Sequence, residues 1–426
     1  MPVSWHVARW GDDPFSRGSW SYIRTGGSPA DRWTLAEPID DRFVLCGEAV
    51  GTDQPSMAHG ALDSGMRAGR WAATVASPGE RIAVIGAGFA GVGAAAELAR
   101  AGVEHLVLEA RPRVGGRVHT VELLDAHGVS PVAVDAGAAW LQQFPKNPLA
   151  ALATELGAML VPTDFHNPLD AARGDGHHER GAVAAAFQAL TLAARRATED
   201  HDCSMLDVID ALDAPNDVAL LNAIEGDVIL ETGGPLAETS ARWFIGEDGV
   251  GNDDHWIVGG YQRLLTHLAE DAHIRLGAHV VHIAWTPGGL AITLTDGETV
   301  NADRCICSVP ISLLQRGDVG LDPGLSARQR IALSRIGFGV VEKVILRFDE
   351  RWWPAPPAGY MRWYDTPASW CEWVDLTDGC GAPVVAGLIG GEAVDRYHRG
   401  RSDADVARRA TSALEDWAAA VRRLAG

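Results

Sequence analysis

The chain has 426 residues, of which 47% are hydrophobic, and its 56 acidic against 36 basic side chains give a net charge of −20. This length allows roughly two or three domains. A strongly acidic chain lacks the basic surface that nucleic acids require, so a nucleic-acid-binding protein is excluded. The charge would attract cationic substrates, although an acidic surface also serves solubility alone.

The sequence has no apolar run of about 18 residues and no basic-plus-apolar leader at its start, so we expect neither a membrane span nor secretion. Its six cysteines show no C-x-x-C spacing, and Cys305 and Cys307 lie in an apolar strand pattern. Buried, reduced thiols are therefore expected, which predicts a cytoplasmic protein.

The segment Arg81–Gly93 (RIAVIGAGFAGVG) is typical of a strand–turn–helix unit that binds a dinucleotide. A β-branched run precedes Gly86, Gly88 and Gly91, which have the spacing G-x-G-x-x-G. The first glycine permits a tight turn, the second lets the backbone approach a pyrophosphate, and the third lets the helix pack closely. A second apolar run ends in Glu109, an acid placed to accept from ribose hydroxyls.

An arginine-rich loop, ARPRVGGRVHT, follows this acid directly. The combination E-x-x-x-x-x-G-G-R resembles the signature of FAD-dependent amine oxidases, in which the glycines and the last arginine continue the pyrophosphate site. A nicotinamide-binding domain has no need for it. The resemblance implies FAD contacts from Glu109, Ala110, Arg111, Gly115, Gly116 and Arg117.

The resemblance continues along almost the whole chain, in the family's order. The matching segments are Val134–Gln142, Trp256–Ala269, Ile274–Ile283, Cys305–Leu314 and Ile336–Pro354. It implies that Ala138, Ala139 and Trp140 pass the flavin ring, and that the backbone of Val280 meets the adenine.

The first 75 residues resemble the segment that normally ends members of this family. Arg9–Tyr22 matches its W…DP…GS…S portion, and Arg42–Val75 matches its FAGE-like turn and the helix after it. We therefore interpret the chain as a circular permutant, joined by the linker Ala76–Glu80, which requires the joined ends to be close and exposed. The alternative, a chance match in a separate domain, would leave the FAD site without its closing segment, because residues 355–426 contain none.

The resemblance implies an α/β fold, with a Rossmann-type FAD-binding domain and a second, α+β substrate domain. The expected division is 1–78 (permuted closing segment), 79–148 (Rossmann FAD-binding segment), 149–255 (first segment of the substrate domain), 256–312 (FAD-binding domain, continued) and 313–426 (second segment of the substrate domain).

Periodicity gives some elements within this frame. Helical patterns occupy residues 182–200, 217–231 and 402–424, and strand-like alternation occupies 290–294 and 343–348. Glycine- and aspartate-rich breaks at 172–181 and 246–254 flank the first two helices, which belong to the insertion that sets substrate choice in the family.

In this family the amine's α C–H gives a hydride to flavin N5, water hydrolyses the resulting imine, and oxygen reoxidises the flavin to give hydrogen peroxide. The protein supplies position and electrostatics. Lys343 matches the lysine that reaches N5 through a water; the alternative is an outward-facing strand lysine. Gly47 and Glu48 match the turn whose acid lies near the ribityl chain, and a helix starting at about Met57 and Ala58 would point its positive end at the flavin.

Four positions bear on the substrate and on how FAD is attached. Trp20 matches an aromatic wall of the amine cage, or else it only packs. Met57 replaces the second cage aromatic, as in the histone-lysine-demethylase branch, and Gln142 stands where polyamine oxidases often carry histidine. Because Ser19 occupies the position of the cysteine that links covalently to FAD in some members, we expect FAD to be bound non-covalently.

Some conspicuous residues keep two interpretations. The aromatic residues Trp352, Trp353, Trp363, Tyr364, Trp370 and Trp373 line a substrate tunnel or pack a sheet. Residues 177–179 (HHE) and the pair His201 and Cys203 suggest metal ligands, but neither group has a second pair, so no metal is expected.

Three functions remain open. The first is an FAD oxidase of a small amine with oxygen as acceptor. The second is an L-amino-acid oxidase or monooxygenase, which needs an arginine for the substrate carboxylate, with Arg242 and Arg362 as candidates. The third is a non-catalytic flavin-binding interaction protein. The oligomeric state is left open, a homodimer being one choice.

Overall fold

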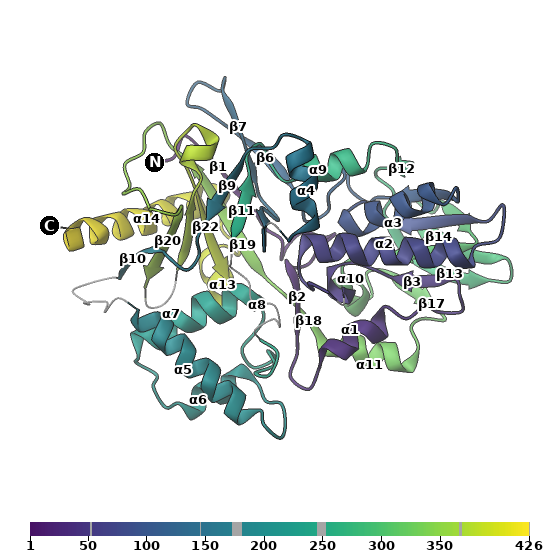
Figure 1. Cartoon of the computed structure of the whole chain (residues 1–426), viewed down its shortest axis with the longest axis horizontal. Helices are drawn as coiled ribbons and strands as arrows, with labels where there is room; N and C mark the ends of the chain where they lie inside the picture. The colour runs from purple at the N-terminus through teal and green to yellow at the C-terminus, as the bar shows by residue number, and fades with distance from the viewer. Residues whose placement is uncertain (52, 145, 173–180, 245–252, 366–368, 426) are drawn as a thin grey trace. The chain divides into compact units, whose positions relative to one another are not determined.

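The structure is a computed structural model that describes residues 1–51, 53–144, 146–172, 181–244, 253–365 and 369–425. Almost all of the breaks expected at 172–181 and 246–254, and all of residues 177–179, lie outside these ranges. The chain forms two compact units, each built from separate segments (Figure 1). We call them the parallel-sheet unit (Asp12–Val118 and Gln262–Phe338) and the mixed-sheet unit (Met1–Gly11, His119–Tyr261 and Gly339–Gly426).

The parallel-sheet unit is built on a five-stranded sheet. Its strand order is β12 (Ile274–Arg275), β5 (Glu104–Leu108), β4 (Arg81–Ile85), β16 (Arg304–Cys307) and β3 (Phe43–Leu45), all parallel. These strands are short apolar runs, as expected where helices cover a parallel sheet. The edge strand β3 comes from the segment before the glycine motif, so residues 43–45 extend the same sheet.

Two long helices of this unit pack backbone to backbone. They are α2 (Ala58–Val75), which precedes the glycine motif, and α3 (Phe89–Arg100), which follows it. A Cβ at Gly65 would lie 1.8 Å from the carbonyl oxygen of Ala90, and one at Gly69 would lie 2.6 Å from that of Ala94. Only glycine permits this approach, so the segment before the motif is an integral part of the nucleotide-binding layer.

Further elements complete the unit. A four-stranded sheet has the order β15 (Thr299–Ala302), β14 (Gly289–Leu294), β13 (Val280–Thr286) and β17 (Gly320–Asp322), and β2 (Trp20–Ile23) pairs with β18 (Ile336–Gly339). The short helices are α1 (Pro29–Leu35), η1 (Glu48–Val50), α9 (Gln262–Leu268), α10 (Ile311–Arg316) and α11 (Ala327–Arg335).

The mixed-sheet unit is built on six strands in the order β1 (Ser4–Val7), β19 (Val341–Arg347), β22 (Val384–Gly390), β21 (Glu372–Asp375), β20 (Tyr360–Tyr364) and β10 (Leu169–Ala172). Smaller pieces are the three-stranded sheet β8 (Trp140–Leu141), β11 (Asp254–Ile257) and β9 (Leu160–Thr163), and the hairpin β6 (Thr120–Leu124) and β7 (Pro131–Asp135). Its other helices are α4 (Pro148–Glu155), α6 (Met205–Ala211), α12 (Thr377–Cys380) and α13 (Glu392–Tyr397).

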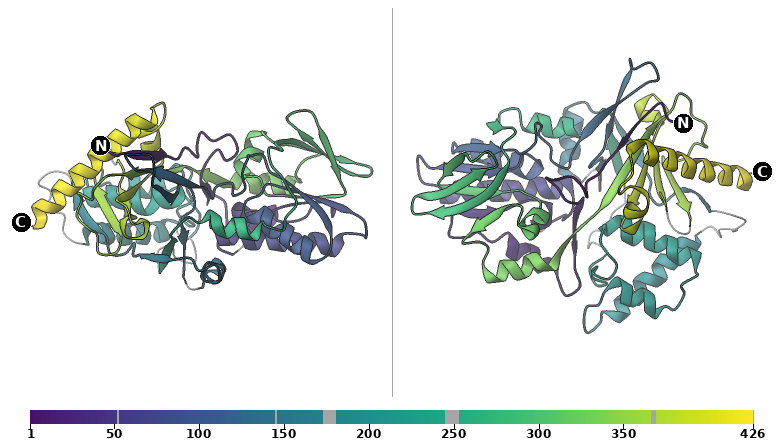
Figure 2. Two further views of the ribbon diagram at one scale, coloured as in Figure 1. Left: turned by 90° about the horizontal axis from the view of Figure 1, so that it is seen from above. Right: turned by 180° about the vertical axis from the view of Figure 1, so that it is seen from behind.

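One face of the six-stranded sheet is covered by the C-terminal helix α14 (Asp403–Ala425), which crosses in front of it in the right-hand view of Figure 2. Trp363 and Trp373 of the sheet, Trp370 beside it and Trp417 of the helix are each at most 1% exposed and belong to one apolar cluster. Trp363, Trp370 and Trp373 therefore pack the core, and the tunnel interpretation is wrong for these three residues. The buried Trp353 and half-buried Trp352 belong to the same cluster.

The helices predicted in the divergent region are confirmed. The first is α5 (Ala182–Ala197), and the second begins as α7 (Val218–Ile224). The second does not continue as a regular α-helix, because the π-helical turn η2 (Glu225–Ile229) precedes its last turn, α8 (Leu230–Thr232). Such turns are rare and often occur at functional sites. Tyr364 packs against this helical group.

The other predicted elements are also present: β14 at 289–294, β19 at 341–347 and α14 at 403–425. The fold class is mixed α/β, as expected. The two units, however, divide the chain differently from the expected boundaries: residues 1–11, 119–148 and 256–261 belong to the mixed-sheet unit, and 313–338 to the parallel-sheet unit. Strand pairing explains the first case, because β1 is hydrogen-bonded to β19.

Among the described residues, no helix is long and apolar enough to cross a membrane. Each of the six cysteines, all within the described ranges, is a thiol, and Cys305 and Cys307 are buried in β16.

Candidate active site

The glycine turn between β4 and α3 has the geometry that the sequence predicts. Gly86 has φ +96°, and a Cβ on Gly91 would lie 1.8 Å from the Gly86 carbonyl oxygen, so both positions require glycine. A Cβ on Gly88 would meet no atom closer than the Gly115 carbonyl oxygen, at 3.7 Å. The space beside Gly88 is thus left by the protein where a pyrophosphate is expected.

The start of α3 suits the same anion. Gly88 is its N-cap residue and no side chain caps the helix, so its positive end faces that space. Helix α2 begins in the same way, with Met57 as its N-cap and no side-chain cap, which confirms the predicted helix start. In both helices the N-cap residue, Gly88 or Met57, makes no capping hydrogen bond with a side chain of its own.

Glu109 lies at the end of β5 and is 5% exposed. Its Oε2 accepts from the N–H of Ala87 at 2.7 Å, and its Oε1 accepts from the N–H of Arg111 at 2.8 Å. Each carboxylate oxygen has a second lone pair, so these bonds fix the acid and leave it able to accept from ribose hydroxyls. The N–H of Ala278 donates to the Glu109 carbonyl, which brings the segment leading to Val280 beside this acid.

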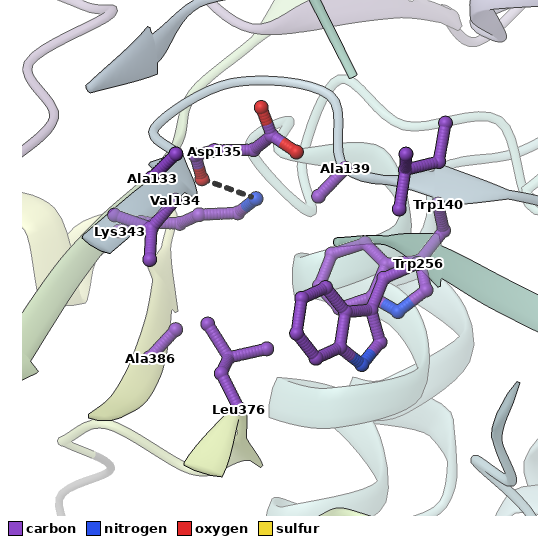
Figure 3. A pocket seen from close by; sticks show the side chains of 10 residues that line it. Ala133, Val134, Asp135, Ala139, Trp140, Trp256, Lys343, Leu376 and Ala386 are labelled. Carbon is purple, nitrogen blue, oxygen red and sulfur yellow. Dashed lines mark hydrogen bonds between the residues drawn. The ribbon is translucent and has the colours of Figure 1, made fainter. Parts of the chain in front are cut away.

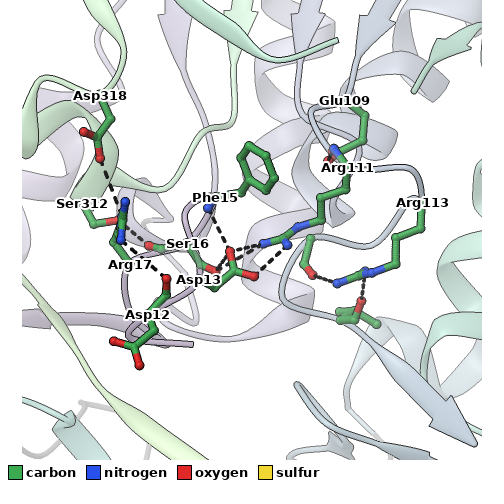
Figure 4. Close-up of polar contacts among 12 residues, drawn as sticks. Asp12, Asp13, Phe15, Ser16, Arg17, Glu109, Arg111, Arg113, Ser312 and Asp318 are labelled. Carbon is green, nitrogen blue, oxygen red and sulfur yellow. Dashed lines mark hydrogen bonds and ion pairs between the residues drawn. The ribbon is translucent and has the colours of Figure 1, made fainter. Parts of the chain in front are cut away.

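Arg111 forms a two-pronged ion pair with Asp13 (Figure 4). Nη1 donates to Oδ2 at 2.8 Å and Nη2 to Oδ1 at 2.7 Å, while the Phe15 ring lies 5.2 Å from the guanidinium. Because of this pair, the pKa of Asp13 stays below its ordinary value even though burial acts to raise it. We did not predict this partner; the acid of the DP pair in WGDDP was the available signal.

Arg117 and Glu48 also meet directly. Arg117 Nη1 donates to Glu48 Oε1 and to the Ser19 carbonyl, both at 2.8 Å. The other carboxylate oxygen of Glu48 accepts from the Ser21 hydroxyl at 2.6 Å, and Arg32 donates to that hydroxyl at 2.7 Å. The structure thus connects two residues that are 69 positions apart and were expected at one site; Arg32, fully enclosed in the unit, was missed.

The remaining predicted residues divide between the two units. The parallel-sheet unit holds the nucleotide residues together with Gly47, Glu48, Trp20, Met57, Ala58 and Val280. The mixed-sheet unit holds Ala138, Ala139, Trp140, Gln142 and Lys343.

Lys343 lies on β19 and is 8% exposed, so the outward-facing alternative is wrong. Its ammonium donates to the Gly137 carbonyl at 2.6 Å and lies 4.8 Å from the centre of the Trp140 ring. It also donates to the Asp135 carbonyl at 3.4 Å (Figure 3). Burial lowers the pKa of Lys343 to about 8, while the charge of Asp135 acts to raise it. Its proton therefore exchanges much nearer to neutral pH than that of an exposed lysine.

Asp135 ends β7 and is 8% exposed. Its carboxylate accepts from the Thr120 hydroxyl at 2.6 Å and from the N–H of Tyr261 at 3.0 Å. Burial raises its pKa to about 6, although these donors and Lys343 act in the opposite direction. The segment VDAGAAW was singled out for the flavin, but its acid received no role; an acid at the end of an apolar strand was the signal that we missed.

A small cavity lies beside Lys343 within the mixed-sheet unit. The indole rings of Trp140 and Trp256 form one side, and Leu376 and Ala386 lie opposite (Figure 3). Its volume is about 20 Å³, which is room for roughly one water molecule.

Strand register places a row of side chains on the same sheet face as Lys343. Lys343 pairs with Leu388, Leu388 with Glu372, and Glu372 with Arg362, and residues paired in this way share a face. Arg362 Nη1 donates to Asp227 at 3.1 Å, and its Nη2 lies 3.9 Å from Glu372. Burial raises the pKa of Glu372.

The π-helical turn fits this row. A Cβ on Gly226 would lie 1.6 Å from Arg362 Nη2, so the guanidinium occupies the space beside that glycine. The other arginine candidate, Arg242, is exposed and donates to the Thr198 carbonyl. Strand register therefore shows that Arg362, and not Arg242, shares a sheet face with Lys343. The periodicity of the sequence could not show this.

No group of three or more potential metal ligands occurs among the described residues. His201 and Cys203 are among these residues, whereas residues 177–179 lie outside them.

A glycine turn, an acid at the end of the next strand and an arginine loop on a parallel sheet are typical of a dinucleotide-binding protein, and a second unit carries a buried lysine. The family model for "flavin containing amine oxidoreductase" matches residues 1–70, 89–220 and 230–423. The chain belongs to this family of flavoproteins, and its cofactor is FAD.

Several relatives are similar to the chain. Polyamine oxidase 4 of rice (Oryza sativa subsp. japonica) is 30% identical over 73% of this chain and 67% of its own length. Lysine-specific histone demethylase 1 homolog 1 of rice is 28% identical over 76% of this chain but only 41% of its own length, so the chain spans less than half of that relative. A solved structure of putrescine oxidase bound to putrescine, 20% identical, has a TM-score of 0.59 over 80% of this chain and 81% of its own, which shows the fold.

Proposed function

We propose that the chain is an oxidase of a small amine, with oxygen as the electron acceptor. Bound FAD would supply the acceptor for the hydride of the α carbon and the route of its two electrons to oxygen, with an imine and hydrogen peroxide as the products. The observation that carries this proposal is Lys343, a buried ammonium held by two backbone carbonyls beside a cavity of water size. Burying an ammonium costs free energy that packing does not return.

The residues of the parallel-sheet unit would hold the cofactor. The turn at Gly86 and Gly88 and the start of α3 would meet the pyrophosphate, Glu109 would accept from the ribose, and Arg117 would continue the phosphate site. Trp20 and Met57, which belong to this unit, would contact the amine. The charge of the pair Arg117–Glu48 is balanced, so each side chain is fixed before the ligand arrives.

Arg362 supports an amine over an amino acid as substrate. An amino-acid oxidase needs an arginine that is available to the substrate carboxylate, whereas Arg362 has Asp227 at 3.1 Å and Glu372 at 3.9 Å. Its charge is thus opposed by acids of the protein, and a further carboxylate would be repelled by both. The same surroundings suit an amine whose far end is neutral or cationic.

The relatives also include histone demethylases, whose substrate is a peptide side chain. The chain matches 41% of the length of the rice demethylase homolog, against 67% of the length of rice polyamine oxidase 4. A small amine therefore fits better. A flavin-binding protein without turnover is disfavoured, because Lys343 would then be buried without a purpose.

A substrate panel tests these alternatives. Purified protein should be yellow and should release hydrogen peroxide with at least one free amine, and much less with the same amine carrying an α-carboxylate. Acid precipitation should leave a colourless pellet, as expected for non-covalent FAD. Peroxide from the carboxylated partner alone would favour the amino-acid oxidase, and a yellow protein that never reduces its flavin would favour the binding protein.

We also propose that the chain is circularly permuted. The family model matches residues 1–70 as a separate segment. In the structure β3 extends the parallel sheet, and α2 packs on α3 and reaches β4 through the five residues Ala76–Glu80. In addition, the alignment to putrescine oxidase covers 80% of this chain, close to the share that stays in order after residue 78 (348 of 426 residues).

Reordering the chain tests the permutation. A gene that opens within Ser77–Glu80 and joins the present ends by a Gly/Ser linker of about 15 residues should give folded protein that retains FAD. A control opened between Cys305 and Cys307, inside buried β16, should not fold. Equal failure of both openings, or equal success, would contradict the proposal.

The six thiols support a reducing compartment, and we propose a cytoplasmic location. Retention of activity after treatment with a thiol oxidant, with disulfides formed, would argue against it.

A further inference from the structure

Three segments that lie far apart in the sequence meet around Lys343. They are the hairpin β6–β7, which ends at Asp135, the turn before α9, which contains Gly260 and Tyr261, and β19. Gly260 has φ +96°, and a Cβ there would lie 2.3 Å from the Thr120 side chain, so this turn packs directly against the hairpin.

The Asp135 carboxylate connects these segments. The carboxylate accepts from the Thr120 hydroxyl on β6 and from the N–H of Tyr261. The backbone carbonyl of the same residue accepts from Lys343 Nζ. The Gly137 carbonyl, two residues later, is the closer acceptor of the lysine at 2.6 Å. The carboxylate therefore anchors the turn whose carbonyls hold the ammonium.

The acceptors of Lys343 have a chemical consequence. Backbone carbonyls attract an ammonium but carry no net charge, so they stabilise its charged form less than a carboxylate does. Asp135 supplies a full negative charge behind this turn, in a buried region where charges act strongly.

We propose that Asp135 is a positioning residue for Lys343: it anchors the turn that binds the ammonium, and its charge keeps that ammonium protonated at neutral pH. The inference rests on the proposed function for its catalytic meaning, but the charge relationship exists independently of turnover.

Other groups around Lys343 do not supply this charge. Burial raises the pKa of Tyr261 and of Cys380, so both remain neutral near pH 7, and burial lowers the pKa of His6 on β1. Glu372 and Arg362 share the sheet face across Leu388 and lie 3.9 Å from each other, and burial raises the pKa of Glu372. Arg347 lies four residues along β19 and donates to the Leu123 and Ser130 carbonyls, while Glu342 alternates to the other face and binds His398 at 2.8 Å.

The sequence makes this proposal measurable without any turnover. Lys146 and Lys343 are the two lysines of the 426-residue chain, and Lys146 is exposed. Protein grown with ¹³C-lysine therefore gives two sets of lysine ¹³Cε signals, and Lys146→Arg leaves one. The pH midpoint of that signal reports the protonation of Lys343 directly, with or without FAD.

Asp135→Asn is the decisive variant, because an amide oxygen still accepts from the Tyr261 N–H while the charge is lost. We expect the Lys343 midpoint, near pH 8 in the wild type, to fall by about one pH unit or more. The matched control is Asp254→Asn. Asp254 is also buried, accepts from the N–H of Gln143 at 3.0 Å and has its pKa raised to about 6, but its loss should leave the midpoint in place.

Activity provides the second readout. The pH at which kcat/KM is half of its plateau value should shift in Asp135→Asn by the same amount as the NMR midpoint. In Asp135→Glu, this pH should return to its wild-type value. In a Lys343→Met background, Asp135→Asn should have no further effect on the pH profile. If the half-plateau pH shifts in that background as well, Asp135 acts independently of the lysine and the proposal is wrong.

Each outcome decides something. An unchanged NMR midpoint in folded Asp135→Asn overturns the proposal. If that variant does not fold, Thr120→Val serves instead: without its hydroxyl donor the carboxylate is harder to ionise, so the Lys343 midpoint should fall by a smaller amount, and no fall overturns the proposal. If Asp135→Asn shifts the NMR midpoint but the wild-type protein oxidises no amine, the proposed link between Asp135 and Lys343 stands and the proposed function is wrong.

Discussion

The charged groups around the glycine turn differ from those around Lys343 in the partners that they bind. In the parallel-sheet unit, Arg111 and Arg117 each meet a carboxylate directly, at 2.7 to 2.8 Å. In the mixed-sheet unit, the Lys343 ammonium donates to backbone carbonyls, and the carboxylate of Asp135, whose charge acts on it, accepts from other donors. The ion pairs of the parallel-sheet unit keep both partners charged, whereas the surroundings of Lys343 allow its ammonium to lose a proton.

This difference fits the roles that we propose for the two regions. A site for a pyrophosphate needs donors that are held in place and permanently charged, which arginine with a paired acid supplies. A group that takes part in a reaction needs a proton that can leave near neutral pH, which a buried lysine supplies. The predictions below test this comparison, from the largest expected effect to the smallest.

Gly88→Val should abolish FAD retention, because the side chain would occupy the space that the protein leaves for the phosphates. Purified variant should be colourless and should not take up added FAD. Gly288→Val in the same unit is the control, since a Cβ there meets no atom within 4 Å, and it should remain yellow. A yellow Gly88→Val protein would mean that the pyrophosphate lies elsewhere.

Lys343→Met should keep the fold and FAD but slow flavin reduction, reoxidation or both by at least tenfold, about 1.4 kcal/mol of barrier. Stopped-flow measurement of each half-reaction separates the two. Lys146→Met, at the exposed lysine, should leave both rates unchanged. Wild-type rates in both half-reactions of the Lys343 variant would remove this lysine from the mechanism.

Asp13→Asn should weaken FAD binding by about five- to tenfold, because Arg111 would lose the charged half of its ion pair. The apo protein should keep nearly the same melting temperature, so that fluorescence titration with FAD reports the site and not the fold. Glu298→Gln, which breaks the exposed pair with Arg275, should leave the affinity unchanged. Equal losses in the two variants would show that the Asp13 pair has no special role.

The stability of the apo protein should depend on pH through the Lys343 region. The pKa of Asp135 is raised from 3.8 to about 6, so between these values the folded state binds more protons than the unfolded state. Stability therefore falls as pH rises through that window. The pKa of Lys343 is lowered from 10.5 to about 8, so stability should rise again from about pH 8 to pH 10.5.

Denaturant midpoints across this pH range measure both trends. Asp135→Asn should flatten the acid limb, and Lys343→Met should flatten the alkaline limb, each by less than about 1.4 kcal/mol per pH unit. If both pH trends of stability persist in the two variants, groups other than Asp135 and Lys343 cause them.

Local sequence was sufficient for the nucleotide turn and for the regular helices. The glycines at 86 and 91 are required by a turn and by a helix contact within a few residues of each other, so their spacing carries the geometry. Amphipathic periodicity predicted α5 and α14 to within about three residues at each end. By contrast, nothing local distinguished Arg362 from Arg242, because strand register decides which arginine lies on the same sheet face as Lys343. Nothing local showed whether Trp363 packs in the core or lines a tunnel either, because helix α14 on one sheet face decides that.

The sequence by itself determined the family, the cofactor and the residues of the dinucleotide turn, because these depend on short spacings and on backbone conformations that only glycine adopts readily. The tertiary structure alone decided which charges are paired. Asp13 meets Arg111 across 98 positions, and Asp135 is held by Tyr261 across 126 positions. Such contacts depend on how sheets and loops bring distant segments together, and they set the proton equilibrium of Lys343, because burial and neighbouring charge are properties of the folded chain.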